Sequence, residues 1–305
     1  MKNLGAAKWV EHPDNPLIRP EPPNWLLGDP TLLTPDRTPD GKWRLFCNSV
    51  RWVYQYVSDD GVQWVRQDRP VCRGMRAFVY REDDLYYLFC ELHNATYTRS
   101  RIVARTSRDL LNWSDPTQLL VPQFAWDGVF PRYVGNPCLI KVGDRYRLYY
   151  SSGFIVLADT VVTEPKYIGV AQSEAILGPY RRHPVPLIGP HPDHPWRNRG
   201  AGSIKVYPRR GGGFWAFNNG IYRGADGRHG SAIMLLESAD GYRFHEVRDE
   251  PIVKPSAGWT RAFAYAFDMT EYAGEVRLYF NARDGWAKGK EHIGFVRAAR
   301  TREEE

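Results

Sequence analysis

A carboxylate stands in an unusual setting near the N-terminus, in the stretch NWLLGDPTLLTPDRTPDGKWRLFCNS (residues 24–49). Asp29 lies between Gly28 and Pro30, directly before an apolar run that is typical of a strand. An acid at such a position can act as a general base or a nucleophile if it faces a pocket. The alternative is structural, because Asp-Pro is a common turn dipeptide and glycine permits unusual backbone angles.

Two further acids could form an acid/base pair with Asp29. Glu91 ends the apolar run LYYLFCE, where burial would raise its pKa into the range of a proton donor. Asp268 ends the run AFAYAFD and is the second candidate. The alternatives are a Glu91 that is bonded to His93 or Arg76, and an Asp268 that caps the turn before Thr270.

The elements that would position these acids follow from internal repeats. A first kind of segment starts at residues 28, 75, 135, 200 and 264, and each copy is followed, after a turn, by an aromatic-rich run. A third kind, with alternating apolar residues, occupies 53–61, 101–109, 167–175, 232–241 and 292–300. A closing segment with an aromatic and then a Pro-aliphatic pair recurs at 64–71, 113–120, 180–188 and 244–253.

Four strands per unit, repeated five times, predict an all-β fold, a five-bladed β-propeller with four-stranded antiparallel blades. The fifth closing strand is missing at the C-terminus, and WVEHPDNPLI (residues 9–18) has its form. We therefore expect the N-terminal strand to close the ring by pairing with residues 292–298, which makes residues 1–305 a single domain. Two stacked sandwiches are the alternative, but they do not explain the orphan strand.

In a propeller the first strand of each blade lines the central channel, so polar residues at the strand mouths should share one pocket. The residues predicted to bind substrate there are Trp25, Asn48, Arg76, Asn136, Arg199, Asn218 and Arg283. Aromatic rings can stack on sugar faces. The arginines can hold a carboxylated sugar or a phosphate through bidentate contacts, or else neutralise the acids of the pocket.

Together with GDP (28–30), GNP (135–137), SDDGVQW (58–64) and EHIGF (291–295), this architecture resembles the glycoside hydrolases of family 43 and the related families 32, 62, 117 and 130. The resemblance implies an Asp base in blade one, a second Asp in blade three and a Glu acid in blade four. Asp29 matches the first. Asn136 stands at the second position, and RGAGS (199–203) has no Glu.

The resemblance also implies a His near a central cation, and His292 in KEHIGF takes that place. A divalent cation such as calcium is therefore a candidate cofactor, although no cofactor is required by the sequence. No cluster of Asp, Glu and His with ligand spacing supports a metal by itself, and the alternative is a histidine that is hydrogen-bonded within the channel.

Composition restricts the partners. The net charge of +6 comes from scattered Lys and Arg without a run of five or six like charges, so a nucleic-acid partner is not predicted. The N-terminus has no apolar signal region and no stretch of about 18 apolar residues occurs, so neither export nor membrane insertion is predicted, and a cytoplasmic location is expected.

The sequence thus predicts a glycoside hydrolase-like enzyme that acts on a terminal or short-chain carbohydrate. Asp29 is the predicted base or nucleophile, and Glu91 or Asp268 the predicted acid. A related glycoside phosphorylase, with the arginines holding phosphate, is a close alternative. A non-catalytic glycan-binding propeller is the alternative from another class, because Asn136 and the missing blade-four Glu leave half of the usual pair unfilled.

Overall fold

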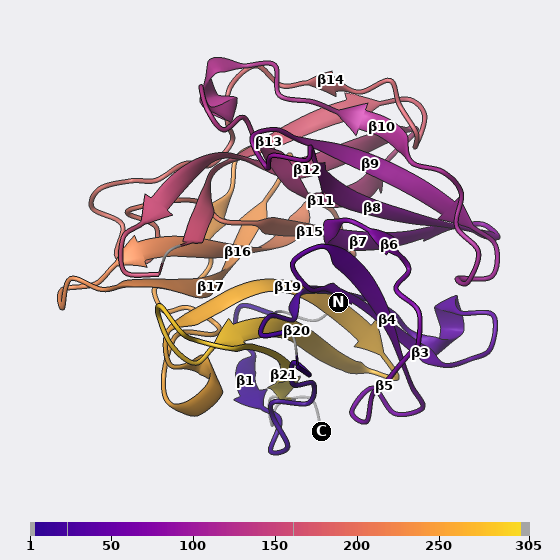
Figure 1. The fold of residues 1–305 in the computed structure, drawn as a ribbon, viewed down its shortest axis with the longest axis horizontal. Helices are drawn as coiled ribbons and strands as arrows, with labels where there is room; N and C mark the ends of the chain where they lie inside the picture. The colour runs from indigo at the N-terminus through magenta and orange to yellow at the C-terminus, as the bar shows by residue number, and fades with distance from the viewer. Residues whose placement is uncertain (1–3, 23, 161, 300–305) are drawn as a thin grey trace.

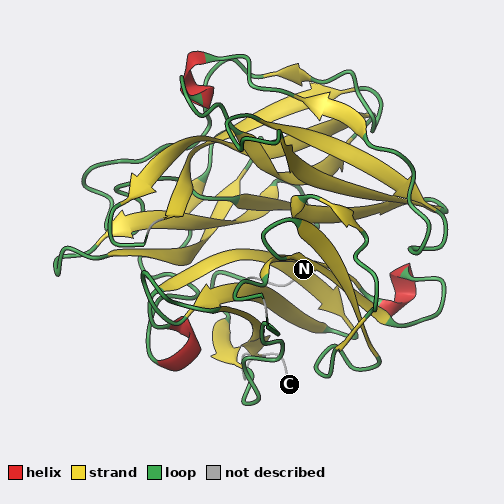
Figure 2. Cartoon of the chain, in the orientation of Figure 1, coloured by secondary structure: helices red, strands yellow, loops and turns green. Residues whose placement is uncertain are grey.

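The computed structural model describes residues 4–22, 24–160 and 162–299, and this part of the chain consists almost entirely of strands and turns (Figure 2). Its helical elements are three single 3-10 turns, η1 (Pro35–Arg37), η2 (Ala125–Asp127) and η3 (Gly258–Thr260). The predicted all-β class is confirmed. None of the helices in the described part of the chain has the length and hydrophobicity needed to cross a membrane.

Three antiparallel sheets account for residues 28–182. The first contains β2 (Gly28–Leu33), β3 (Trp43–Asn48), β4 (Trp52–Ser58), β5 (Val65–Arg66) and β6 (Cys72–Arg73). The second contains β7 (Met75–Glu82), β8 (Leu85–His93), β9 (Ser100–Ser107) and β10 (Thr117–Leu120). The third contains β11 (Val134–Val142), β12 (Arg145–Leu157), β13 (Val162–Ser173) and β14 (Arg181–Arg182).

The remaining strands form one eight-stranded sheet with two antiparallel halves. One half contains β15 (Ile204–Pro208), β16 (Phe214–Arg223), β17 (His229–Ser238) and β18 (His245–Glu246). The other contains β19 (Phe263–Tyr272), β20 (Glu275–Arg283), β21 (Glu291–Ala299) and β1 (Lys8–Glu11). The halves are joined by a single parallel pair, Ser231 and Phe263.

The first strands of successive sheets lie together. Their labels β7, β11, β15 and β19 gather near the middle of Figure 1, whereas β10 and β14 lie towards its edge. Contacts run from β2 to β7, β7 to β11, β11 to β15, β15 to β19, and from β19 back to β2. This arrangement brings the starts of five first strands to one place.

The N-terminal segment pairs with the last strand. β1 runs antiparallel to β21 with Trp9 opposite Ala298 and Glu11 opposite Val296, and Ile18 bridges to Ile293. The edge of β21 is therefore covered by the other end of the chain, in the pairing that the repeat pattern predicts.

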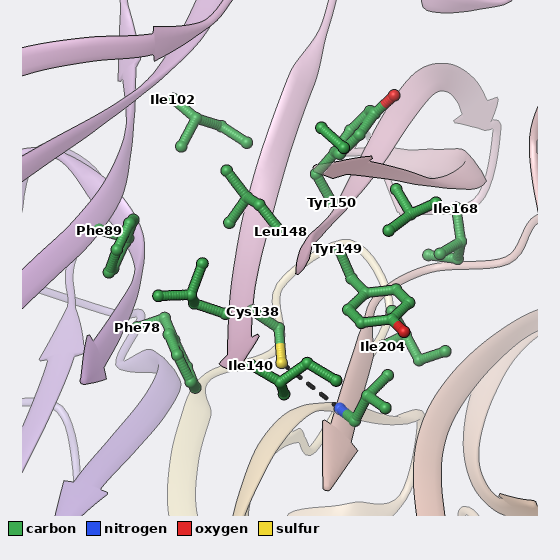
Figure 3. Packing of buried hydrophobic residues seen from close by; sticks show 14 of the residues in the cluster. Phe78, Phe89, Ile102, Cys138, Ile140, Leu148, Tyr149, Tyr150, Ile168 and Ile204 are labelled. Carbon is green, nitrogen blue, oxygen red and sulfur yellow. Dashed lines mark hydrogen bonds between the residues drawn. The ribbon is translucent and has the colours of Figure 1, made fainter. Parts of the chain in front are cut away.

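Apolar side chains fill the spaces between neighbouring sheets. Figure 3 shows Phe78 and Phe89 of the second sheet facing Leu148 of the third, with Ile204 of β15 beyond Tyr149. All five are at least nine-tenths buried. Such packing fixes each sheet against the next and so holds the strand starts in place.

Candidate functional site

One irregularity, repeated in four first strands, shapes the candidate site. Between Gly28 and Thr31 of β2 the ladder gains one residue over β3, and β7, β11 and β19 have the same bulge. Three of the bulged residues have left-handed backbones, with φ of 55° at Asp29, 51° at Arg76 and 48° at Asn136. A bulge of this kind redirects a side chain that would otherwise follow the pleat.

The redirected residues line a pocket that encloses about 590 Å³, counting the space open to solvent at its mouth. The polar residues lining it are Asp29, Asn48, Arg76, Asn136, Thr163, Glu164, Ser203, Asn219, Tyr265, Asn281 and Glu291. Three of them are carboxylic acids, and one is a guanidinium.

Asp29 is held by its own backbone and by neighbours on both sides. Its N–H donates to Asn281 Oδ1 at 3.1 Å, and its carboxyl lies beside Asn48 and Arg76. Burial raises the pKa of Asp29, Arg76 opposes that effect, and the negative charge of Glu91 adds to it. The result is a carboxyl whose pKa stands above its ordinary value.

Glu91 lies behind the pocket wall and is fully buried. Both of its oxygens accept from Arg76 Nη1, at 3.0 and 3.1 Å, and the Tyr133 hydroxyl donates to it at 2.8 Å. His93 Nε2 contacts the same carboxylate. Burial alone would raise the pKa of Glu91, but Arg76, His93 and Tyr133 outweigh it and hold the pKa below its ordinary value. The bonds to Arg76 and His93 that the sequence offered as the alternative are both present.

This network also explains a glycine. Gly135 precedes Asn136, and a Cβ at Gly135 would collide with the Glu91 carboxylate. Asn136 itself lines the pocket and donates from Nδ2 to the Tyr133 hydroxyl at 3.2 Å. Asn48 also lines the pocket, and its Oδ1 accepts the Arg76 N–H at 2.6 Å. Asn48, Arg76 and Asn136 are thus brought together with Asp29.

Asp268 lies apart from this pocket. Its carboxylate accepts from Thr31 Oγ1 at 2.8 Å, from the Leu32 N–H at 3.0 Å and from the Tyr207 hydroxyl at 2.8 Å. It lines a second cavity with Leu32 and Tyr80, towards the other ends of the first strands. The structure therefore does not bring Asp268 together with Asp29 in one pocket.

Two acids that sequence reasoning missed do line the pocket with Asp29. Glu164 stands at the start of β13, where burial, and then the charge of Asp29, raise its pKa to about 7 against the pull of Arg76 and Arg283. Glu291 opens β21, and burial, Asp29 and Glu164 raise its pKa to about 8. Asn281 Nδ2 donates to Glu291 Oε2 at 3.0 Å.

A sequence signal for these acids exists at the starts of the third strands. Glu291 directly precedes HIGF, and Glu164 stands three residues before YIGV, so the two acids lie two positions apart in the aligned repeats, each shortly before an Ile-Gly pair. β12 and β13 are also longer than their counterparts, with Ile155 opposite Glu164, and this extended hairpin carries Glu164 to the pocket.

The other predicted binding residues surround the pocket without lining it. Arg283 is 2% exposed, and its guanidinium carbon lies 5.4 Å from the ring centre of Trp25, which is 41% exposed. Asn218 is fully buried and donates to the backbone of its own sheet, to Ala201 O and Ser203 O. Arg199 is exposed, and its N–H donates to Ile221 O.

His292 is buried beside Asp284, with Nε2 at 3.5 Å from Asp284 Oδ2. Burial lowers its pKa. Within the described residues no group of three or more His, Cys, Asp or Glu side chains is arranged to hold a metal ion. A cation at His292 is therefore not supported by a ligand set there.

Comparisons with known proteins identify the fold. No family model and no curated protein matches the chain. Among solved structures, the catalytic domain of a Coprinopsis cinerea GH62 α-L-arabinofuranosidase has a TM-score of 0.72 at 14% identity, covering 97% of this chain and 98% of that one.

Two further solved structures are of proteins described with other glycans. One comes from work on the GH130 mannoside phosphorylases, a family containing glycoside hydrolases that target β-1,2 mannosidic linkages in Candida mannan. It has a TM-score of 0.67 at 17% identity, covering 95% of this chain and 93% of that one. An N-acetylgalactosamine deacetylase from F. plautii, in complex with blood group B trisaccharide, has a TM-score of 0.65 at 13% identity, covering 96% and 94%. The resemblance predicted from the sequence is confirmed at the level of fold, because this chain shares the fold of solved glycoside hydrolases, with structures from families 62 and 130 among them.

Proposed function

We propose that the chain is a glycoside hydrolase that cleaves a terminal or short-chain glycosidic bond in the pocket containing Asp29. The observation that carries this proposal is the gathering of Asp29, Glu164 and Glu291 in one pocket with their pKa values raised. Glycoside hydrolysis needs a protonated carboxyl group as the acid at neutral pH, and a raised pKa keeps a carboxyl group available for that role.

The proposed architecture is a five-bladed propeller formed by residues 1–305 as one domain. The cyclic contacts of β2, β7, β11, β15 and β19 support five blades, if the eight-stranded sheet is divided at its single Ser231–Phe263 pair. The pairing of β1 with β21 supports closure of the ring by the N-terminal strand. In this arrangement the pocket lies at one mouth of the central channel.

Asp29 is the proposed base or nucleophile. It starts an inner strand, lines the pocket and lies beside Arg76, whose positive charge favours the ionised carboxylate. Glu164 is the proposed acid, because a pKa of about 7 keeps much of it protonated up to neutral pH. Glu91 is proposed as a positioning residue that fixes Arg76 through its two carboxylate oxygens. Asp268 is proposed as a structural residue.

Two other functions compete. A non-catalytic glycan-binding propeller is disfavoured by the presence of two further acids in the pocket with Asp29. A phosphorylase would need a site for phosphate, and Arg76 is the one guanidinium among the described residues that line the pocket. Both functions give distinct results in the experiment below.

The proposal is tested by incubating the protein with a panel of aryl glycosides and plant and bacterial oligosaccharides, with and without inorganic phosphate. Release of reducing sugar that does not require phosphate is expected. Turnover only with phosphate would identify a phosphorylase. Thermal stabilisation by a glycan without any turnover would identify a binding protein.

A further inference from the structure

One corner of the pocket holds hydrogen-bond donors that have no acceptor. Tyr265 lines the pocket and is 8% exposed, and its hydroxyl lies near Glu164 and Arg283 but makes no hydrogen bond of normal geometry with any described residue. Nε and Nη1 of Arg283 are also buried without a partner. Arg283 makes no ion pair with a carboxylate of the described residues within the 4.0 Å that defines one. A buried hydrogen-bond donor without an acceptor is costly, so these groups call for a counterpart.

Arg76 adds unused donors on the same pocket. Only Nη1 of its guanidinium is engaged with Glu91, and no described residue accepts from Nε or Nη2. Its side chain is 18% exposed and lines the pocket. The other cation near Asp29, Lys205, already donates to Pro137 O at 3.0 Å. The open donors of the pocket therefore lie on Arg76 and Tyr265, with the charge of Arg283 close to Tyr265.

The protonation of the acids around these donors determines whether an anion can bind beside them. The charged or titratable residues that interact here, each from a different strand, are Asp29, Arg76, Glu164, Tyr265, Arg283 and Glu291. Glu291 and Glu164, with pKa values of about 8 and about 7, are largely uncharged on the acidic side of neutrality. A protonated carboxyl can donate a hydrogen bond, so both acids tolerate a neighbouring anion in that form.

We propose that this corner binds the carboxylate of an acidic sugar, with Arg76 and Tyr265 contacting it and Arg283 supplying positive charge behind them. A guanidinium presents parallel N–H groups that match a planar carboxylate, which favours a uronic acid over a neutral sugar. A cationic amino sugar would leave the donors of Arg76 and Tyr265 unsatisfied. This inference rests on the proposed function only in taking the ligand to be a sugar.

The test uses free monosaccharides and the intact chain, so it does not depend on turnover. Glucuronate, glucose and glucosamine, and the matching galactose series, are titrated by calorimetry at pH 6.0 and 7.5 in buffers of different ionisation enthalpy. We expect a uronate to bind at least tenfold more tightly than its neutral counterpart. At pH 7.5 we also expect uptake of up to about one proton, as the anion favours protonation of Glu291 and Glu164.

Arg283→Met should abolish the preference for the uronate, because the positive charge behind the contact is removed, and the melting temperature of the variant shows that it is folded. Arg283→Lys, which keeps the charge, should retain part of the preference. Arg209→Met is the matched control, since Arg209 also lies over a tryptophan, 4.2 Å from the ring centre of Trp215, but outside the pocket. It should leave the preference unchanged.

Several results would overturn the inference. They are a uronate that binds no better than the neutral sugar, a tighter amino sugar, or inorganic phosphate alone competing as well as the uronate. Retention of the uronate preference in Arg283→Met would overturn the role of Arg283. Hydrolysis of neutral glycosides without any uronate preference would overturn this inference and leave the proposed function standing. Uronate binding without hydrolysis of any glycoside would support this inference and contradict the proposed function.

Discussion

Replacing Glu164 with Gln should change how the stability of the protein depends on pH. The pKa of Glu164 is raised from 4.5 to about 7, so the folded state binds a proton more tightly than the unfolded state. The stability associated with the protonated form is fully present below about pH 4.5 and is lost as the pH rises through 7. A difference of this size corresponds to about 3 kcal/mol, most of which falls between pH 5 and pH 8.

The assay is urea unfolding followed by tryptophan fluorescence at pH 5, 6, 7 and 8. We expect the free energy of unfolding of the wild type to fall by about 2 to 3 kcal/mol more than that of Glu164→Gln over this range. Glu164 also helps to raise the pKa of Glu291, so its removal should flatten the profile further. Glu174→Gln, at an acid whose side chain is 84% exposed, is the control. Parallel profiles for wild type and Glu164→Gln would refute the reasoning.

Three further outcomes follow from the contacts. Asp268→Asn should cost about 2 kcal/mol or more of stability, because the carboxylate accepts three hydrogen bonds, yet leave kcat unchanged; a large loss of kcat in folded protein would make Asp268 catalytic. Glu91→Gln should cost about 3 kcal/mol by leaving Arg76 without its ion pair, and denaturant unfolding that matches the wild type would contradict this. Deletion of residues 1–18 should destabilise the whole domain and expose the edge of β21, and a monomer that melts like the intact chain would disprove closure by this segment.

The repeats made most of the strand arrangement accessible from the sequence. Each first strand is followed by an aromatic-rich second strand, and the orphan segment at residues 9–18 could be matched to the missing closing strand. Period and order are local properties, so they survive in a single sequence. The bulges that turn Asp29, Arg76 and Asn136 towards the pocket begin at the segment starts that the repeats identify.

The partners of the acids were less accessible, because they depend on distances between sheets. Glu91 and Asp268 both end apolar runs, but Glu91 meets Arg76 and His93, while Asp268 meets Thr31 and Tyr207. Glu164 lies outside the repeat run YIGV, three residues before it, and the lengthening of β12 and β13 brings it to the pocket. The fate of a carboxylate is thus decided by the neighbours that folding supplies.

The most direct test of the proposed function is the turnover of Asp29→Asn on whichever glycoside the wild type hydrolyses. The variant keeps the size of the side chain and its place between Asn48 and Arg76, but it cannot act as base or nucleophile. We expect kcat to fall by about a thousandfold or more, with a melting temperature within a few degrees of the wild type. Full activity in a correctly folded Asp29→Asn protein would contradict the account, because the chemistry would then not pass through this pocket's central carboxylate.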